Sequence, residues 1–188
     1  MKLSFIALLG FLAPLAMGAD SNLLQNPSFE DKGQQADLSE HWNRWGQWIN
    51  RETSWVPTHS GSCLIGYHHW QIESSANSGI WQDLPKISAG QRYKFSAFVM
   101  SDKVDSGAPF QKVELRLEAT RNGQQVTIAS ATYSSQDLPA GATWHQVSVT
   151  GTTPENNLRV LIVVTPAADG PRGGALKIDD VALEVVPK

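Results

Sequence analysis

Apolar and polar residues alternate with a period of two through most of the chain after its first twenty or so positions. The alternation is clearest in residues 112–120, where the apolar positions are Val113, Leu115, Leu117 and Ala119 and the polar positions are Glu114, Arg116 and Glu118. A strand with this pattern has one buried face and one solvated face. After the N-terminal stretch, no segment longer than a turn or two shows a 3.6-residue apolar period, so the pattern predicts an all-β protein.

A β-hairpin is predicted around residues 121–123. The turn sequence Arg121-Asn122-Gly123 separates the strand at 112–120 from a second alternating run at 125–133. Asn-Gly favours a tight turn because both residues tolerate a positive φ. The two runs are therefore expected to pair antiparallel.

Further strands are predicted at residues 63–67, 80–84, 91–100, 144–150, 158–165 and 175–186. Gly, Pro and Asn punctuate the connections between them, as short turns require. Residues 158–164 are apolar at nearly every position, which predicts a central strand covered on both sides. About nine short strands with this spacing predict a two-sheet antiparallel β-sandwich, a jelly roll.

The N-terminus has the pattern of a secretory signal peptide. Lys2 precedes a nearly unbroken apolar run at residues 3–15, and residues 16–19 are small or apolar as a cleavage site requires. We therefore expect a signal peptide at 1–19, one β-sandwich domain at 20–188, and a secreted or periplasmic protein. The apolar run is shorter than the ~20 residues needed to cross a bilayer, so no membrane span is predicted.

Composition narrows the range of partners. A formal net charge of −3 is too weakly acidic to indicate nucleic acid or an anionic membrane, and 41% hydrophobic residues suffice for one core. The single cysteine, Cys63, excludes a disulfide within the chain. Its neighbours favour a small buried strand residue over a reactive thiol. The sequence specifies no oligomeric state.

Several segments resemble, in order, the jelly-roll carbohydrate-binding modules of the cellulose- and xylan-binding type, which have a galactose-binding-like fold. Residues 22–30, from Asn22 to Phe29-Glu30, resemble the opening strand of that family. The other matching segments are 42–46, 59–64, 79–82, 89–93, 144–147 and 178–183. The resemblance covers nearly all of the chain after the signal peptide and implies the fold more specifically than the ligand.

The resemblance also implies a structural calcium ion. The family's site, transferred residue by residue, would use the Glu30 carboxylate, one of the paired aspartates, here Asp179, and carbonyls of Ser28, His59 and Ser62. Carboxylate and carbonyl oxygens are the ligands that Ca²⁺ takes. The alternative is that these acids hydrogen-bond turns and loops without a metal.

The chain has 7 Trp, which are candidates for stacking on sugar rings. Trp81 and Gln82 are the leading candidates because members with a cleft carry an aromatic and polar residues near this strand, and Trp70 in a polar loop follows. Trp48 and Phe110 are weaker candidates for the rim of a cleft. Trp42 and Trp144 are expected in the core, and Glu114 and Arg116 on a solvated face.

The sequence predicts a secreted, non-catalytic module that binds a poly- or oligosaccharide, without enzyme activity. An envelope or extracellular-matrix module that binds a protein partner on the same fold is the alternative. A polysaccharide lyase or glycosidase is a third possibility, since Gln71-Ile72-Glu73 differs by one residue from a lyase triplet. The difference falls on the residue expected to transfer a proton. His68 and His69 lack the spacing of a transition-metal site.

Overall fold

The computed structural model describes residues 22–35, 37–46, 48–53, 57–68, 76–102, 110–138, 141, 143–166 and 175–187. The signal peptide predicted at 1–19 lies outside these ranges. Within them the chain forms ten strands and no helix. The strands are β1 (Asn43–Trp45), β2 (Ile49–Glu52), β3 (Leu64–His68), β4 (Ser78–Leu84), β5 (Arg92–Asp102), β6 (Lys112–Arg121), β7 (Gln124–Ser134), β8 (His145–Thr152), β9 (Leu158–Thr165) and β10 (Ala175–Val185).

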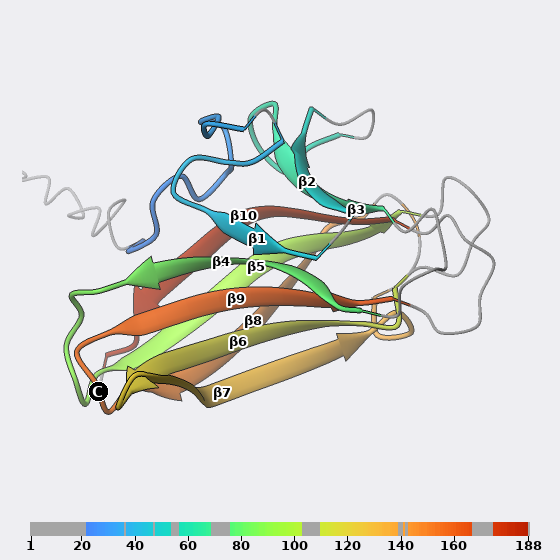
Figure 1. The fold of residues 1–188 in the computed structure, drawn as a ribbon. Helices are drawn as coiled ribbons and strands as arrows, with labels where there is room; N and C mark the ends of the chain where they lie inside the picture. Colours follow the sequence, from blue (N-terminus) through green and yellow to red (C-terminus); the bar gives the residue numbers. More distant parts are fainter. Residues whose placement is uncertain are drawn as a thin grey trace, which may run out of the picture.

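The ten strands form two five-stranded antiparallel sheets that lie face to face (Figure 1). The front sheet has the order β1-β4-β9-β6-β7, and the back sheet has the order β2-β3-β10-β5-β8. Consecutive strands often belong to different sheets, as in a jelly roll. The predicted all-β sandwich is confirmed.

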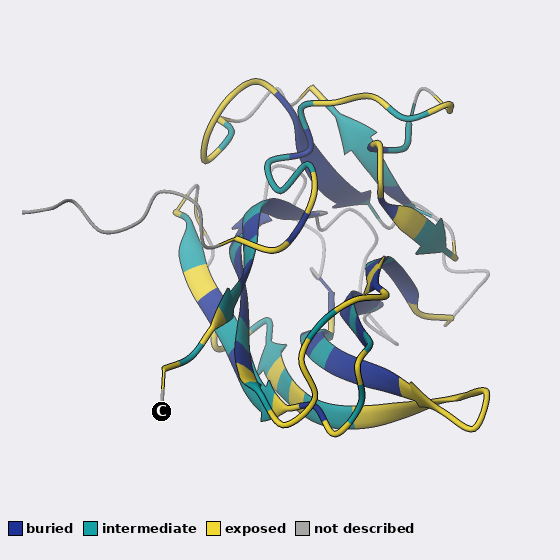
Figure 2. Cartoon of the chain, turned by 90° about the vertical axis from the view of Figure 1, so that its left-hand side faces the viewer, coloured by how far each residue is buried: buried dark blue, intermediate teal, exposed yellow. Residues whose placement is uncertain are grey.

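Alternation along each strand builds the core between the sheets. On β6, Val113, Leu115 and Leu117 are almost fully buried, while Glu114 and Arg116 between them are partly exposed. They pack against inward-facing residues of the back sheet such as Phe95 on β5. Figure 2 shows buried positions along the strands and mostly exposed positions in the connections.

The predicted hairpin is confirmed as β6 and β7. Its two-residue turn has φ values of 52° at Asn122 and 77° at Gly123, the conformation that Asn-Gly favours. The pairing register shifts between Leu117 and Glu118, because β7 carries one extra residue, Ile128, at that point. Ile128 is therefore a β-bulge.

The opening segment differs from the prediction, because residues 22–30 form turns rather than a strand. Positive φ values of 47° at Asn26 and 60° at Phe29 interrupt the extended backbone. Two backbone hydrogen bonds still fix the segment to β10, from Leu23 N–H to Leu183 O and from Val181 N–H to Pro27 O. β1 and β2, with three and four residues, were too short to show an alternating pattern.

Single-residue expectations for the core are met at Trp42 and Cys63 and fail at Trp144. Trp42 is 3% exposed and Cys63, just before β3, is 4% exposed. Trp144 is partly exposed, because its neighbour His145 pairs with the core residue Val99 and alternation turns Trp144 to the outer face. Among the described residues, no helix has the length and apolar character to cross a membrane.

Candidate functional site

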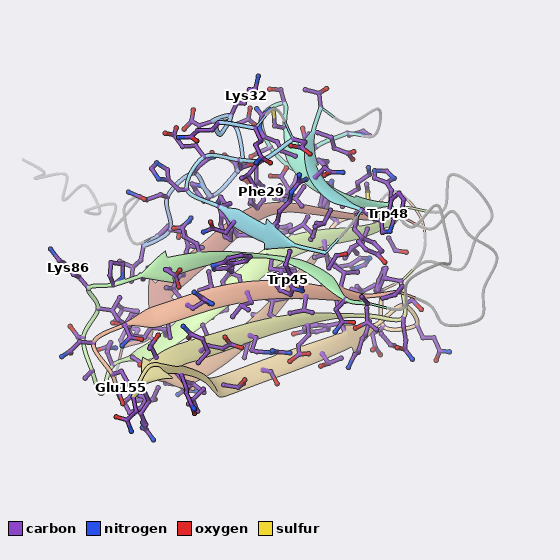
Figure 3. All side chains as sticks on the ribbon, viewed as in Figure 1. Phe29, Lys32, Trp45, Trp48, Lys86 and Glu155 are labelled. Carbon is purple, nitrogen blue, oxygen red and sulfur yellow. The ribbon has the colours of Figure 1, made fainter. Side chains whose placement is uncertain are left out.

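The outer face of the front sheet carries two tryptophans on neighbouring strands. On β4, Ile80 points into the core, so Trp81 points outward and is partly exposed. Trp45 on β1 lies opposite Gly79 of β4, which puts its side chain on the same face. Figure 3 places Trp45 over this sheet.

The two indoles form an angled pair. Their ring centroids are 5.7 Å apart and their planes are inclined by 49°. Gly79 makes room for this pair, because a Cβ at Gly79 would lie 2.1 Å from Cη2 of Trp45 and 2.6 Å from the Ile162 carbonyl oxygen. The lack of a side chain at position 79 therefore lets the Trp45 ring lie against the backbone of β4.

Arg159 on β9 borders the same surface. Its guanidinium carbon lies 5.5 Å from the centre of the Trp81 ring, a cation–π distance. The Asp83 carboxylate accepts two hydrogen bonds from it, at 2.6 Å from Nε and 3.0 Å from Nη2. A shallow open pocket of about 270 Å³ lies here, lined by Trp45, Trp81, Arg159 and Leu161.

Charged side chains of β6 lie on the same outer face of the front sheet. Arg116 donates to Glu114 at 2.9 Å and to Glu118 at 3.3 Å. The hydrogen bond from Arg116 is the main reason why the pKa of Glu114 lies below its usual value. Leu161 on β9 lies between Trp81 and Arg116 in the ladder and is 7% exposed. The outer face of the central strand is thus covered by side chains of its neighbours.

This arrangement suits a ligand with flat apolar faces and hydroxyl edges. The Trp45 and Trp81 rings offer apolar surface, and the ion-paired side chains beside them offer fixed donors and acceptors. The hydrogen bond from Arg116 lowers the pKa of Glu114 and favours its ionised form, so Glu114 is a poor proton donor. The pKa of Asp179 is raised by burial to about 6, but Asp179 lies on β10 of the back sheet.

The two leading sugar-binding candidates lie on opposite faces of β4. Trp81 belongs to the outer face, whereas Gln82 is 4% exposed and points inward. The Gln82 side-chain oxygen accepts from Gln25 N–H at 2.8 Å, and its amide nitrogen donates to Gln25 O at 2.9 Å. Gln82 therefore fastens the N-terminal segment to β4 and is not part of the Trp81 surface.

The weaker candidates are also placed away from Trp81. Phe110 is 1% exposed and belongs to the core, so it cannot border a cleft. Trp48 packs against the core at the start of β2, and its carbonyl accepts from His68 N–H at 2.8 Å. In Figure 3, Trp48 lies near the end of β3, apart from Trp45. Trp70 lies outside the described residues.

The predicted metal ligands gather around residues 57–63, which connect the N-terminal segment to β10. Both oxygens of Glu30 accept hydrogen bonds, Oε1 from Ser62 N–H at 2.8 Å and Cys63 N–H at 2.9 Å, and Oε2 from Ser62 Oγ at 2.9 Å. Asp179, fully buried, accepts from His59 N–H at 2.9 Å and Ser60 N–H at 3.1 Å.

These contacts also test whether the residues fit calcium. A carboxylate has about four lone-pair sites. Three are used on Glu30, and three on Asp179, whose Oδ1 accepts from Asp180 N–H at 2.8 Å. Arg51 also donates to the Phe29 and Glu30 carbonyls at 2.7 and 2.6 Å, which places a fixed cation beside them.

Hydrogen bonds within the protein therefore already use most acceptor positions of Glu30 and Asp179. Backbone N–H groups of the connection donate to both carboxylates. Ser28 is partly exposed, two residues before Glu30, and takes no part in the described contacts of this cluster. No group of three or more His, Cys, Asp or Glu side chains suited to a metal occurs among the described residues. The calcium ion stays a sequence-based prediction.

Sequence reasoning missed Trp45, Asp83 and Arg159. Trp45 follows the core residue Trp42 by three positions. The strand around Trp45 is too short to show an alternating pattern, so the sequence does not indicate on which face Trp45 lies. Arg159 is the one charged residue in the apolar run 158–164, and that exception was the available signal. Asp83 lies two residues after Trp81 on the same strand, so alternation could have placed both side chains on the same face.

Comparison with known proteins gives one family match. Residues 21–170 match the family described as carbohydrate binding domain. That range contains all the strands of the front sheet and the residues Trp45, Trp81, Asp83 and Arg159. No curated protein sequence is significantly similar to this chain.

Solved structures of similar fold include binding modules and enzymes. One is TmCBM61 in complex with beta-1,4-galactotriose, at 17% identity and a TM-score of 0.61 over 88% of this chain and 99% of that one. Another is a Stig cyclase, Fisc, from Fischerella sp. TAU, at 16% identity and a TM-score of 0.64 over 89% and 98%. At such identities the likeness shows a shared fold alone.

Proposed function

This chain belongs to the carbohydrate-binding domain family, and we propose that it is a non-catalytic module that binds a glycan on the outer face of its front sheet. The observation that carries the proposal is the Trp45–Trp81 pair, partly exposed on one face and bordered by the Arg159–Asp83 ion pair. Aromatic rings beside fixed planar polar groups are what sugar recognition requires.

Each part of this surface has a role. The apolar C–H face of a sugar ring stacks on Trp81 or Trp45, and the inclination of 49° between the indoles favours a single chain over a flat crystalline surface. Arg159, fixed by Asp83, presents its remaining N–H groups to hydroxyls. Among the described residues of this face, the hydrogen bond from Arg116 lowers the pKa of Glu114, which makes Glu114 a poor proton donor and supports binding without turnover.

The location of the protein is part of the proposal. A signal peptide at 1–19 would deliver the module outside the cytoplasm, where polysaccharides are found. A periplasmic and a released protein meet different glycans, so fractionation of expressing cells is the direct measurement. Retention of the whole product in the cytoplasm with residues 1–19 uncleaved would contradict this part.

Replacing the stacking residues tests the proposal. We expect Trp81→Ala and Trp45→Ala each to weaken glycan affinity at least about tenfold, as loss of a central aromatic anchor does. Retention in polysaccharide gels and calorimetry with soluble oligosaccharides measure the effect. Val185→Ala is the control, because Val185 is 47% exposed but lies on β10 of the back sheet.

Two results would contradict the glycan site as drawn. One is unchanged affinity in both Trp variants with a glycan that the wild type retains. The other is lack of retention of the wild type by every glycan in a broad panel, which would favour the alternative of a protein-binding module on this fold.

A further inference from the structure

Strand β7 forms an open edge of the front sheet. Within the described residues it pairs with β6 alone, and Figure 1 shows it as the outermost strand. Its eleven residues, Gln124–Ser134, include no charged residue, Pro or Gly. A long uncharged edge strand offers unpaired backbone groups to another chain.

The other three sheet edges are protected. β1 and β2 have three and four residues, and β2 carries Arg51 and Glu52. β8 is blocked near its middle by Tyr133, whose hydroxyl donates to Ser148 O at 2.9 Å and accepts from Ser148 N–H at 3.0 Å. Short length, charge, bulges and covering segments are the usual protections of an edge. Among the described residues, β7 is protected by the bulge at Ile128 and by the Asp137 cap at Ser134, and the stretch between them has none of these features.

The register of the hairpin identifies the free backbone groups. Ser135 N–H donates to Gln111 O, so the next pair, Lys112 and Ser134, is not hydrogen-bonded, and bonded pairs alternate from there. The N–H and C=O groups of Thr132 and Ser130 therefore point away from β6. Those of Ser134 point the same way but are capped by Asp137, at 2.7 Å and 3.1 Å.

The free stretch has natural limits at both ends. The bulge at Ile128 interrupts the regular ladder on one side, where pairing resumes at Glu118 and Thr127, and the Asp137 cap ends the stretch on the other. Between them, Ser130 and Thr132 are exposed, and Ala131 is partly exposed. Two donors and two acceptors remain, placed symmetrically about Ala131.

We propose that a second copy of this chain pairs with β7 in antiparallel register, with the two-fold axis beside Ala131. In that register Ser130 of one copy faces Thr132 of the other, and all four N–H groups meet a free carbonyl. A register centred on Thr132 would place Ser130 against the capped Ser134. The strand can face itself without opposing like charges, which makes a second copy its fitting partner.

The dimer would have a consequence for glycan binding, which rests on the proposed function. The two front sheets would join into one ten-stranded sheet, with both Trp45–Trp81 pairs on the same face. At a strand spacing of about 4.8 Å, the two Trp81 residues would lie roughly 30 to 35 Å apart. One polysaccharide could then occupy both sites, and avidity would exceed the affinity of either site.

Proline at the edge tests the pairing. Thr132→Pro removes two of the four intermolecular hydrogen bonds, yet is tolerated in a monomer because that N–H is unpaired there. Light scattering after gel filtration, over a range of concentrations, should show a reversible wild-type dimer. We expect Thr132→Pro to raise the dissociation constant of the dimer at least about tenfold. Thr132→Ala should leave this constant unchanged. A wild type that stays monomeric, or a dimer unaffected by Thr132→Pro, overturns the proposal.

A cysteine cross-link tests the register without relying on proline. In the proposed dimer the two Ala131 residues form a non-hydrogen-bonded pair with Cα atoms about 4.5 Å apart, within disulfide range. Ala131→Cys should therefore cross-link under mild oxidation. Ala129→Cys should not, because position 129 would face Tyr133 of the other copy. The native Cys63 is buried and does not interfere. Lack of a cross-link at Ala131 contradicts the register.

Failure of the dimer can be distinguished from failure of the glycan site. With both proposals correct, Thr132→Pro keeps its affinity for a short oligosaccharide but loses at least about tenfold in apparent affinity for the polymer. Equal loss for both ligands would place Thr132 in the glycan site and contradict the avidity. Dimerisation without glycan binding would leave the edge pairing valid and remove the proposed function.

Discussion

Position 79 shows how a missing side chain can make room for a pair of aromatic rings. Gly79 lies under the Trp45 ring, and a methyl group there would overlap the indole at 2.1 Å. We expect Gly79→Ala to displace Trp45 and to reduce glycan affinity about as much as Trp45→Ala does. Calorimetry with a soluble oligosaccharide measures this. Thr132→Ala on the same sheet is the control, and unchanged affinity of Gly79→Ala would mean that Trp45 does not contact the glycan.

Asp83 positions Arg159 rather than contributing much stability. Its carboxylate is about half exposed, so the ion pair should stabilise the fold by less than about 1 kcal/mol. We expect Asp83→Asn to leave the melting temperature nearly unchanged while weakening glycan affinity several-fold, because Arg159 loses its fixed orientation.

The matched control for Asp83 is Glu155→Gln. Glu155 forms a comparable ion pair with Arg121 at 3.0 Å, near the tip of the hairpin. Loss of affinity in Glu155→Gln, or wild-type affinity in Asp83→Asn, would show that the Arg159 ion pair has no special role.

At the scale of elements, the connection at residues 57–63 joins three parts of the chain. It is fastened to Glu30 and to Asp179 by backbone hydrogen bonds, and the His59 ring stacks on Phe98 of β5 at 3.7 Å. His59 Nδ1 lies 2.5 Å from Asp180 Oδ2. We infer from these contacts that the connection holds without a metal.

Chelation distinguishes this inference from the calcium ion that the sequence predicts. We expect the melting temperature to differ by less than about 2 °C between excess EGTA and excess CaCl₂, since an ion that does not bind cannot stabilise the native state. Glu30→Gln should have a lower melting temperature in both EGTA and CaCl₂, because it loses one of the oxygens that accept hydrogen bonds from Ser62 and Cys63. A clear rise with calcium, lost in Glu30→Gln, would restore the calcium site.

Strands β3 to β10 could be predicted from sequence, whereas the shortest two, β1 and β2, could not. Strands β4 to β10 each have at least seven residues, enough for alternation to identify them. β1 and β2 are too short for that, and the opening segment resembled a strand while Asn26 and Phe29 bend its backbone. The pattern therefore predicts the sandwich but misses the strand that carries Trp45.

Of the residues in the candidate site, only Trp81 could be predicted from the sequence. Trp81 could be assigned because its neighbour Ile80 is apolar. Gln82 was paired with Trp81 by sequence proximity, although adjacent strand residues point to opposite faces. Its inward polar side chain is explained by the Gln25 backbone, a partner 57 positions away that no local pattern reveals.

At the scale of the whole molecule, the two sheets have different roles in this account. The front sheet presents the Trp45–Trp81 surface and the open β7 edge. The back sheet holds the buried Asp179 and the Glu52–Lys177 ion pair, with Lys177 fully buried. Family membership and the front-face chemistry support glycan binding, and the enzymes of similar fold share the scaffold alone.

The most direct test follows the indole N–H signals of the 7 Trp by NMR while a soluble oligosaccharide is added. A suitable panel includes β-linked gluco-, xylo- and galacto-oligosaccharides. We expect the Trp45 and Trp81 signals to shift in a saturable way, while those of the buried Trp42 and of Trp144 on the back sheet stay in place. Saturable shifts confined to Trp residues other than Trp45 and Trp81 would contradict the proposed glycan site.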